Sequence, residues 1–244
     1  MLLPFALSLL LNCALVYTRI NWDYLVMVHQ WAPTLCLFME CTKKPVLNKF
    51  TIHGLWAERW PSIKADNCAP VHAFQAENIA DIHENLSQFW PDFLHQSSSH
   101  KFWRHEWKKH GRCVVENDLI RDQSGYFRVS LELWNRTPVL DALQSAGIVP
   151  TDNVKYKTED VIRELSGKFG VRPLVRCMKR RHQTARLVEV RICFSPRLDL
   201  ISCFFIPKNL FLSNKLPNEH LIYGDNVHVG TVDCPDELII PSLK

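Results

Sequence analysis

The sequence has no apolar run long enough to cross a membrane, which takes about 20 residues. The nearest candidate is the N-terminal stretch MLLPFALSLLLNCALV, which carries no acidic or basic side chain and has its apolar centre at Leu7 to Leu11. A short apolar segment at this position is typical of a secretory signal peptide. We expect residues 1–18 to be removed by cleavage after Thr18; a buried N-terminal strand is the alternative.

The sequence also lacks any CxxC pair, which argues against a structural zinc site. Cys13 falls inside the expected signal peptide and leaves an even number of cysteines. In a secreted chain an even number predicts disulfide bonds, although the sequence alone leaves the pairing open. Two Asn-x-Ser/Thr triplets, which begin at Asn85 and Asn135, predict glycosylation. The mature cysteines are Cys36, Cys41, Cys68, Cys113, Cys177, Cys193, Cys203 and Cys234.

No internal repeat, low-complexity tract or linker interrupts the chain. With 244 residues, 47% of them hydrophobic, it can form one sizeable domain. The net charge of +4 suits a polyanionic partner without arguing for one. Periodicity and helix-ending residues predict a single α+β domain over residues 19–244. We expect strands at 23–29, 50–56 and 187–194, a loop at 36–48, and helices at 71–89, 102–113, 129–134, 139–146 and 160–169.

Residues 102–113, FWRHEWKKHGRC, concentrate proton-transfer and anion-binding groups. In a helix, Lys109, Glu106 and His110 lie about 40°, 100° and 140° around the axis from His105, so the four share one side. Trp103 and Trp107 lie toward the far edge of that arc or beyond it, where they can anchor the helix in the core. Three serines, Ser97, Ser98 and Ser99, can cap the start of this helix, and Gly111 can end it.

This stretch alone leaves three interpretations open: an active-site helix, an amphipathic surface helix, or a metal site. The metal site is disfavoured because the zinc-protease pattern needs histidines four residues apart. A second stretch, FTIHGLW at residues 50–56, favours catalysis. Phe50 and Ile52 alternate with Thr51 and His53 as on a strand, so His53 points away from the apolar face. Gly54 lets another group approach the backbone closely.

Together, FTIHGLW and HEWKKHG resemble, in order and separation, the paired active-site segments of the ribonuclease T2 family. Further likenesses are Gln30-Trp31 at a strand end, Phe89-Trp90-Pro91 at a helix end, and RICF before Cys203, so the resemblance spans nearly all of the mature chain. The chain departs from the family at three positions outside the proton-transfer groups: Ala57 and Ala32, where prolines are usual, and Arg112, where a small residue is usual.

The resemblance implies a disulfide-stabilised domain with a central antiparallel sheet flanked by several helices. It also implies a secreted endoribonuclease that cleaves single-stranded RNA through a 2′,3′-cyclic phosphate to 3′-phosphate ends, without a metal or other cofactor. In this comparison His110 is the base and His53 the acid, whereas the residues alone allow the two to exchange. His105 would bind phosphate, Lys109 would neutralise transition-state charge, and Glu106 would orient the histidines.

The resemblance also assigns substrate contacts and bridges. Trp56 would stack on a base and Glu58 would accept a hydrogen bond from it, with Gln30 at a second base site; a core role is the alternative for Trp56. The implied disulfides are Cys36–Cys41, Cys68–Cys113, Cys177–Cys234 and Cys193–Cys203.

We further expect a monomer that does not cleave DNA or span a membrane, and that is extracellular or resides in a lysosome-like acidic compartment. A secreted RNA-binding or signalling protein on the same fold, without turnover, is the alternative function. It is disfavoured because the chain keeps the full set His53, His105, Glu106, Lys109 and His110.

Overall fold

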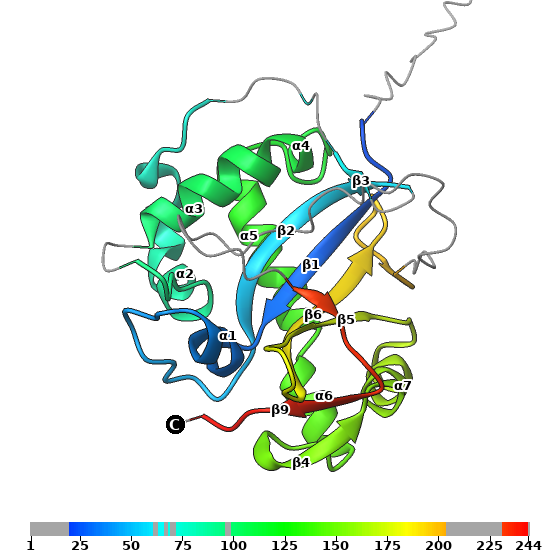
Figure 1. The fold of residues 1–244 in the computed structure, drawn as a ribbon. Helices are drawn as coiled ribbons and strands as arrows, with labels where there is room; N and C mark the ends of the chain where they lie inside the picture. The colour runs from blue at the N-terminus through cyan, green and yellow to red at the C-terminus, as the bar shows by residue number, and fades with distance from the viewer. Residues whose placement is uncertain are drawn as a thin grey trace, which may run out of the picture.

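The structure is a computed structural model that describes residues 20–60, 63–65, 68, 72–95, 99–203 and 231–243 (Figure 1). The expected signal peptide at residues 1–18, with Cys13, lies outside these ranges, as do Ser97 and Ser98. Within the described ranges, no helix combines the length and the apolar composition that a membrane span needs.

A nine-stranded sheet forms the centre of the fold, with the strand order β3-β2-β1-β6-β5-β8. Outside this path, β7 pairs with β6, and β9 pairs with both β4 and β6. The described strand pairs are antiparallel apart from β6 with β9, which is parallel. The strands are β1 (Tyr24–Gln30), β2 (Thr51–Arg59), β3 (Ile63–Lys64), β4 (Thr151–Lys157), β5 (Leu174–Met178), β6 (Ala185–Phe194), β7 (Leu200–Ile201), β8 (Val232–Asp233) and β9 (Glu237–Ile240).

Helices cover the sheet. Figure 1 shows α2 to α5 grouped along β2 and β1, with α6 and α7 beside β4 and β9. Helix α1 packs against β5 and β6. The helices are α1 (Ala32–Phe38), the 3₁₀ helix η1 (Ala76–Ile82), α2 (His83–Phe89), α3 (His100–Glu106), the π-helical turn η2 (Trp107–Gly111), α4 (Arg112–Val114), α5 (Gln123–Arg136), α6 (Val139–Ser145) and α7 (Thr158–Phe169).

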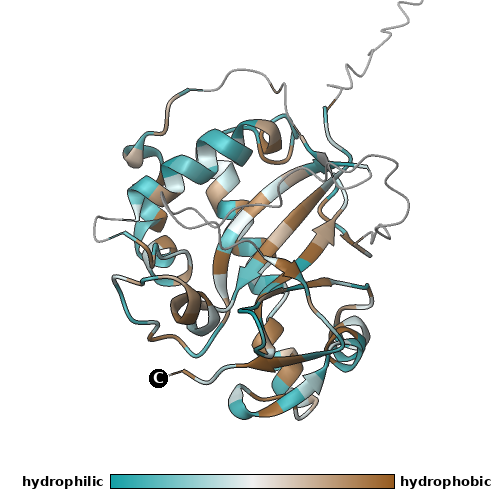
Figure 2. Ribbon diagram, viewed as in Figure 1, coloured by the Kyte–Doolittle hydropathy of each residue, from teal (hydrophilic) through white to brown (hydrophobic). Residues whose placement is uncertain are grey.

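Both faces of strand β1 are buried, because its side chains alternate between two hydrophobic clusters. Leu25 and Met27 belong to the large cluster under the helices, whereas Tyr24, Val26 and Val28 belong to a smaller cluster on the other face. Figure 2 shows the resulting pattern, with hydrophobic colour along the central strands and hydrophilic colour on the outward side of the helices. The expected α+β fold with a central sheet and flanking helices is confirmed.

The structure contains the four disulfide bonds that the family resemblance implied: Cys36–Cys41, Cys68–Cys113, Cys177–Cys234 and Cys193–Cys203. The third bridge joins β5 to the C-terminal segment, and the fourth joins β6 to the residues after β7.

Several elements differ from the sequence-based expectation. The loop expected from Cys36 begins inside α1, whose Pro33 occupies the first turn, where a missing backbone N–H costs nothing. The helix expected at 71–89 is divided into η1 and α2, and strands β4, β5 and β9 were not anticipated. These strands lack the clear apolar alternation that reveals a half-buried strand; β4, for example, is mostly exposed or half-buried.

Substitution by alanine should change the protein's stability in opposite directions at two glycines, one inside α7 and one directly after it. Gly170 follows the helix with φ of +74°, whereas Gly167 lies inside the helix with open space at its Cβ position. Gly170→Ala should lower the free energy of unfolding by about 1–2 kcal/mol, because a side chain disfavours the left-handed conformation. Gly167→Ala should raise it by about 0.5–1 kcal/mol. Urea denaturation measures both, and changes of the same sign would contradict this account of the helix end.

Candidate active site

His53 is the extra residue of a β-bulge in β2. Val28 pairs with Gly54, and the next residue of β1, His29, pairs with Ile52, so His53 has no partner across the strand pair. Bulges re-aim side chains and are common beside active sites. The apolar alternation is shifted here: after Ile52, the large core receives Leu55 and Ala57. The sequence pattern placed His53 off the apolar face, but it gave no sign of the bulge.

Gly54 leaves room for a carboxylate beside the backbone of β2. A Cβ at this position would overlap Glu106 Oε2 and Trp56 Nε1. The expected close approach at Gly54 is therefore confirmed, and the approaching group is the side chain of Glu106.

The segment that carries His105 to His110 is not one regular α-helix. Helix α3 passes into the π turn η2, where the Arg112 N–H bonds the Trp107 carbonyl, and the chain continues helically into α4. The expectation that Gly111 ends the helix is therefore wrong. Gly111 instead lets the Trp107 ring pack against the backbone, since a Cβ there would overlap that ring. His105 and His110 lie on either side of the α-to-π junction, so the angles of a straight helix do not apply to them; such turns are frequent at functional sites.

The ends and anchors of this segment are only partly as expected. Trp103 and Trp107 are buried in the large core, which confirms their expected anchoring role. Ser99 occupies the N-cap position of α3, but its hydroxyl does not cap the helix. The hydroxyl oxygen instead accepts a hydrogen bond from the backbone N–H of Asp92, which ties α3 to the segment after α2.

The indole of Trp56 brings three proposed catalytic side chains together. It stacks on the His110 imidazole, with ring centroids 5.0 Å apart and an interplanar angle of 23°. The His53 ring meets it edge-on at 5.1 Å. Its Nε1 donates a hydrogen bond of 3.0 Å to Glu106 Oε2. Residues from a strand and from a distant helical segment therefore share one buried site.

Burial and charge set the protonation of this site. Burial raises the pKa of Glu106, although His53 and the Trp56 hydrogen bond oppose that shift. Burial, followed by the positive charges of Lys109, His53 and Lys64, lowers the pKa of His105 to about 4. His105 is therefore neutral in the free protein at mildly acidic and neutral pH.

A contact that was not anticipated from the sequence lies behind His53. The Nδ1 atom of His53 is 2.7 Å from Glu189 Oε1, and the other carboxylate oxygen, Oε2, accepts hydrogen bonds from Arg191. The signal was present in β6, where opposite charges alternate with apolar residues in LVEVRICF. Nothing in that pattern, however, connects β6 with the distant His53.

The three predicted base-binding residues are buried. Trp56 is 1% exposed, with one neighbour in His110 and another in the Arg191 guanidinium, 5.2 Å from the ring. Glu58 accepts a hydrogen bond of 2.8 Å from the Tyr24 hydroxyl, and burial raises its pKa. In this arrangement a base can stack on Trp56 only after a neighbour moves, so the base-binding roles of Trp56, Glu58 and Gln30 stay predictions.

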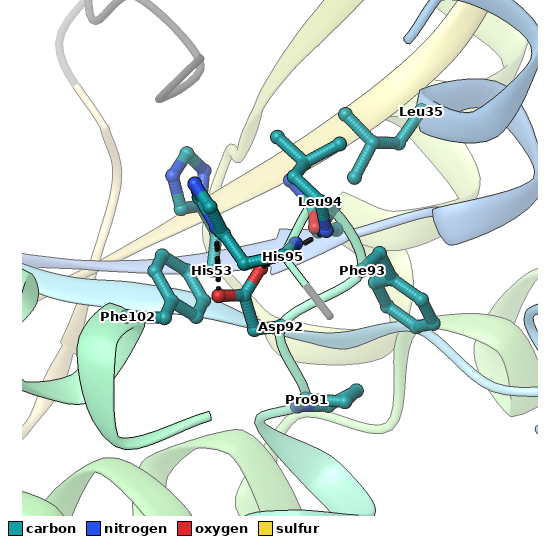
Figure 3. A pocket seen from close by; sticks show the side chains of 9 residues that line it. Leu35, His53, Pro91, Asp92, Phe93, Leu94, His95 and Phe102 are labelled. Atoms are coloured by element: carbon teal, nitrogen blue, oxygen red, sulfur yellow. Dashed lines mark hydrogen bonds and ion pairs between the residues drawn. The ribbon is translucent and has the colours of Figure 1, made fainter. Parts of the chain in front are cut away.

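A pocket adjoins His53 (Figure 3). Phe102 from α3 and the pair Asp92–His95 lie around the imidazole, and His95 Nδ1 is 2.9 Å from the Asp92 carboxylate. Gln30, at the end of β1, also lines this pocket. The pocket places apolar side chains, among them Phe93 and Phe102, and several hydrogen-bonding groups next to the proposed acid.

Two further expectations concern groups outside this pocket. Asn85 and Asn135 are both exposed, and their glycosylation stays a prediction. In the part of the chain that the structure describes, no group of three or more His, Cys, Asp or Glu side chains is arranged to hold a metal ion.

Comparison with known proteins identifies relatives of this chain. The model of the ribonuclease T2 family matches residues 22–203. The chain is 34% identical over 187 residues to ribonuclease T2 of Sus scrofa, covering 75% of this chain and 90% of that protein. It is similar to RNase MC1 from bitter gourd seeds, with a TM-score of 0.67, 30% identity, and 75% and 95% of the two chains covered. A variant of RNase MC1 in complex with 5′-UMP gives a TM-score of 0.68 at 30% identity, covering 76% and 94%.

The low pKa of His105 should depend on Lys109 more than on other nearby lysines. After burial, Lys109 is the largest cause of the shift, and Lys108 contributes less. Lys109→Gln should therefore raise the pKa of His105 from about 4, Lys108→Gln should raise it less, and neither should restore the usual pKa of 6.5. NMR titration of the imidazole signals measures this. Lys101→Gln, on the exposed side of α3, is the matched control; equal shifts from all three changes would contradict the assignment.

Proposed function

The chain is a T2-type ribonuclease of the ribonuclease T2 family, and we propose that it cleaves single-stranded RNA by histidine acid–base catalysis, through a 2′,3′-cyclic phosphate to 3′-phosphate ends. The buried cluster around Trp56 carries this assignment. One indole contacts His53, Glu106 and His110, so that two imidazoles from distant parts of the chain lie 5.1 and 5.0 Å from the same ring. Two imidazoles, one accepting and one donating a proton, are what transphosphorylation requires.

In the first step His110 takes the proton of the ribose 2′-hydroxyl, and the 2′-oxygen forms a bond to phosphorus. The bond between phosphorus and the 5′-oxygen breaks, and protonated His53 gives its proton to that leaving oxygen. In the second step the roles reverse: His53 takes a proton from water, water attacks the cyclic phosphate, and His110 protonates the departing 2′-oxygen. The protein returns to its starting protonation state after both steps.

The remaining polar groups stabilise the charge that develops on phosphorus. Lys109 supplies a positive charge near the phosphorane oxygens. His105, neutral in the free protein because of its low pKa, donates one N–H hydrogen bond to a phosphate oxygen. The phosphate charge would in turn favour the imidazolium form, which strengthens that bond. Glu106 fixes the Trp56 indole, and through it the His110 ring.

The proposal also includes the location of the protein and its substrate class. An N-terminal segment typical of a signal peptide, four disulfide bonds and two exposed asparagines in glycosylation triplets support a secreted or lysosome-like protein. The 5′-UMP bound by a variant of the similar RNase MC1 supports recognition of ribonucleotides by this chain. DNA lacks the 2′-hydroxyl and therefore the internal nucleophile, so it is not a substrate. The protein acts as a monomer.

The purified protein should cleave single-stranded RNA in the presence of EDTA. Proton transfer by imidazoles needs no divalent ion, so the chelator should leave the rate unchanged. Digestion of homopolymeric RNAs, with the ends resolved by mass spectrometry, should first show 2′,3′-cyclic phosphates and later 3′-phosphates. A matched DNA oligonucleotide is the control. Loss of activity in EDTA with recovery on adding a divalent ion would refute the mechanism.

Two histidine variants separate the acid from the base. His53→Ala and His110→Ala should each lower kcat for RNA by about 10²–10⁴-fold. With a nucleoside 3′-(4-nitrophenyl phosphate), the leaving group departs without protonation, so His53→Ala should recover much of its activity and His110→Ala should not. His182→Asn changes an exposed histidine in the turn before β6 and serves as the control. Recovery by His110→Ala instead would reverse the two assignments.

A further inference from the structure

We propose that Glu189, with Arg191 behind it, is the positioning residue of His53: its carboxylate holds the imidazole by Nδ1, directs Nε2 toward the substrate and stabilises the protonated form that donates to the leaving group. This inference rests on the proposed role of His53 as the acid. It goes beyond that role because it assigns a function to a charged pair on β6 that belongs to neither active-site motif.

The contact between Glu189 and His53 is short and buried. Glu189 Oε1 lies 2.7 Å from His53 Nδ1, and the two side chains are 1% and 7% exposed. A hydrogen bond between an ionised carboxylate and an imidazole is stronger than a neutral one and gains further strength where water is excluded. With Nδ1 occupied, Nε2 is the nitrogen left for proton exchange with a substrate.

The carboxylate stays ionised although it is fully buried. Burial alone would raise the pKa of Glu189, but the charge of Arg191 and the hydrogen bond from His53 outweigh burial and hold the pKa well below its usual range. Arg191 donates from Nε at 3.0 Å and from Nη2 at 2.8 Å, both to Oε2.

The arrangement of these bonds distinguishes a positioning role from a purely structural ion pair. An arginine and a carboxylate that only stabilise each other tend to pair through two parallel bonds, one to each oxygen. Here Nε and Nη2 of Arg191 both donate to Oε2 of Glu189, and Oε1 bonds His53. The strand register supports the arrangement, because Glu189 pairs with Gln30 of β1, which lines the pocket beside His53.

Other charged groups also act on His53 and must be considered in any pH dependence. Those that face it or interact with it are Glu189 and Arg191 on β6, His105 and Glu106 on α3, and Asp92 and His95 in the segment after α2. Within this group, Glu106 interacts with His53 through its charge and bonds Trp56, whereas Glu189 bonds the His53 ring directly.

The test is the change Glu189→Gln, which keeps the shape and an oxygen acceptor but removes the charge. We expect kcat for RNA to fall by about tenfold or more with little change in KM, as for other residues that orient a catalytic group. The alkaline limb of the kcat–pH profile should move to lower pH by about one unit or more, because the imidazolium loses its counter-charge. Asp233→Asn, which removes a carboxylate from the buried Arg176 elsewhere in the sheet, is the matched control. It should reduce stability and leave kcat, KM and the alkaline limb unchanged.

If Glu189→Gln lowers only the melting temperature, as the control does, Glu189 is structural and the inference is overturned. A second measurement needs neither a variant nor activity. In the unaltered protein at alkaline pH, ¹⁵N NMR should show neutral His53 with its proton on Nδ1; a proton on Nε2 would overturn the inference even if Glu189→Gln fails to fold. If the protein cleaves RNA but neutral His53 carries its proton on Nε2, the proposed function stands and the inference about Glu189 is overturned. The Nδ1 tautomer without RNA cleavage overturns the proposed function and with it the acid role of His53, and leaves only the orientation of the ring by Glu189.

Discussion

The site depends on one close approach, in which the Glu106 carboxylate reaches the backbone of β2 at Gly54 and accepts a hydrogen bond from Trp56. Because the indole also stacks on His110, the position of that imidazole is coupled to the Glu106 carboxylate through Trp56. A side chain at residue 54 would separate the strand from the helical segment. The absence of a single Cβ therefore allows two elements that lie far apart in the sequence to share one buried site.

Two local irregularities place the proposed proton-transfer groups on these elements. The bulge at His53 turns its side chain out of the regular alternation, and the π turn at Trp107–Gly111 changes the spacing between His105 and His110. Other strands and helices also depart from regular geometry, but these two departures lie at the proposed catalytic groups. Such departures cost stability, and they persist because the surrounding core, including Trp103 and Trp107, fixes them.

The sequence predicted what depends on local pattern. Strands β1, β2 and β6 and helices α5 to α7 follow from apolar periodicity and from end signals such as Gly170, and the two motifs located the candidate site. The pairing of the cysteines came from resemblance alone. What could not be predicted depends on contacts between distant segments: the bulge arises from the register of β2 against β1, and the Glu189–His53 bond joins residues 136 positions apart. Gly111 was misjudged because a glycine that ends a helix and a glycine that admits a tryptophan ring look alike in sequence.

The bridge Cys68–Cys113 has a consequence for the cell that makes this protein. Cys113 lies in α4, directly after the turn that carries Lys109 and His110, so the bridge ties the proposed catalytic segment to Cys68. Native disulfides are typically worth about 2–5 kcal/mol each, against a total stability of about 5–15 kcal/mol for a domain. A copy left in a reducing cytosol would form none of the four bridges and would assemble the site poorly. Assembly of the site is therefore tied to formation of these bridges, which a reducing cytosol does not favour.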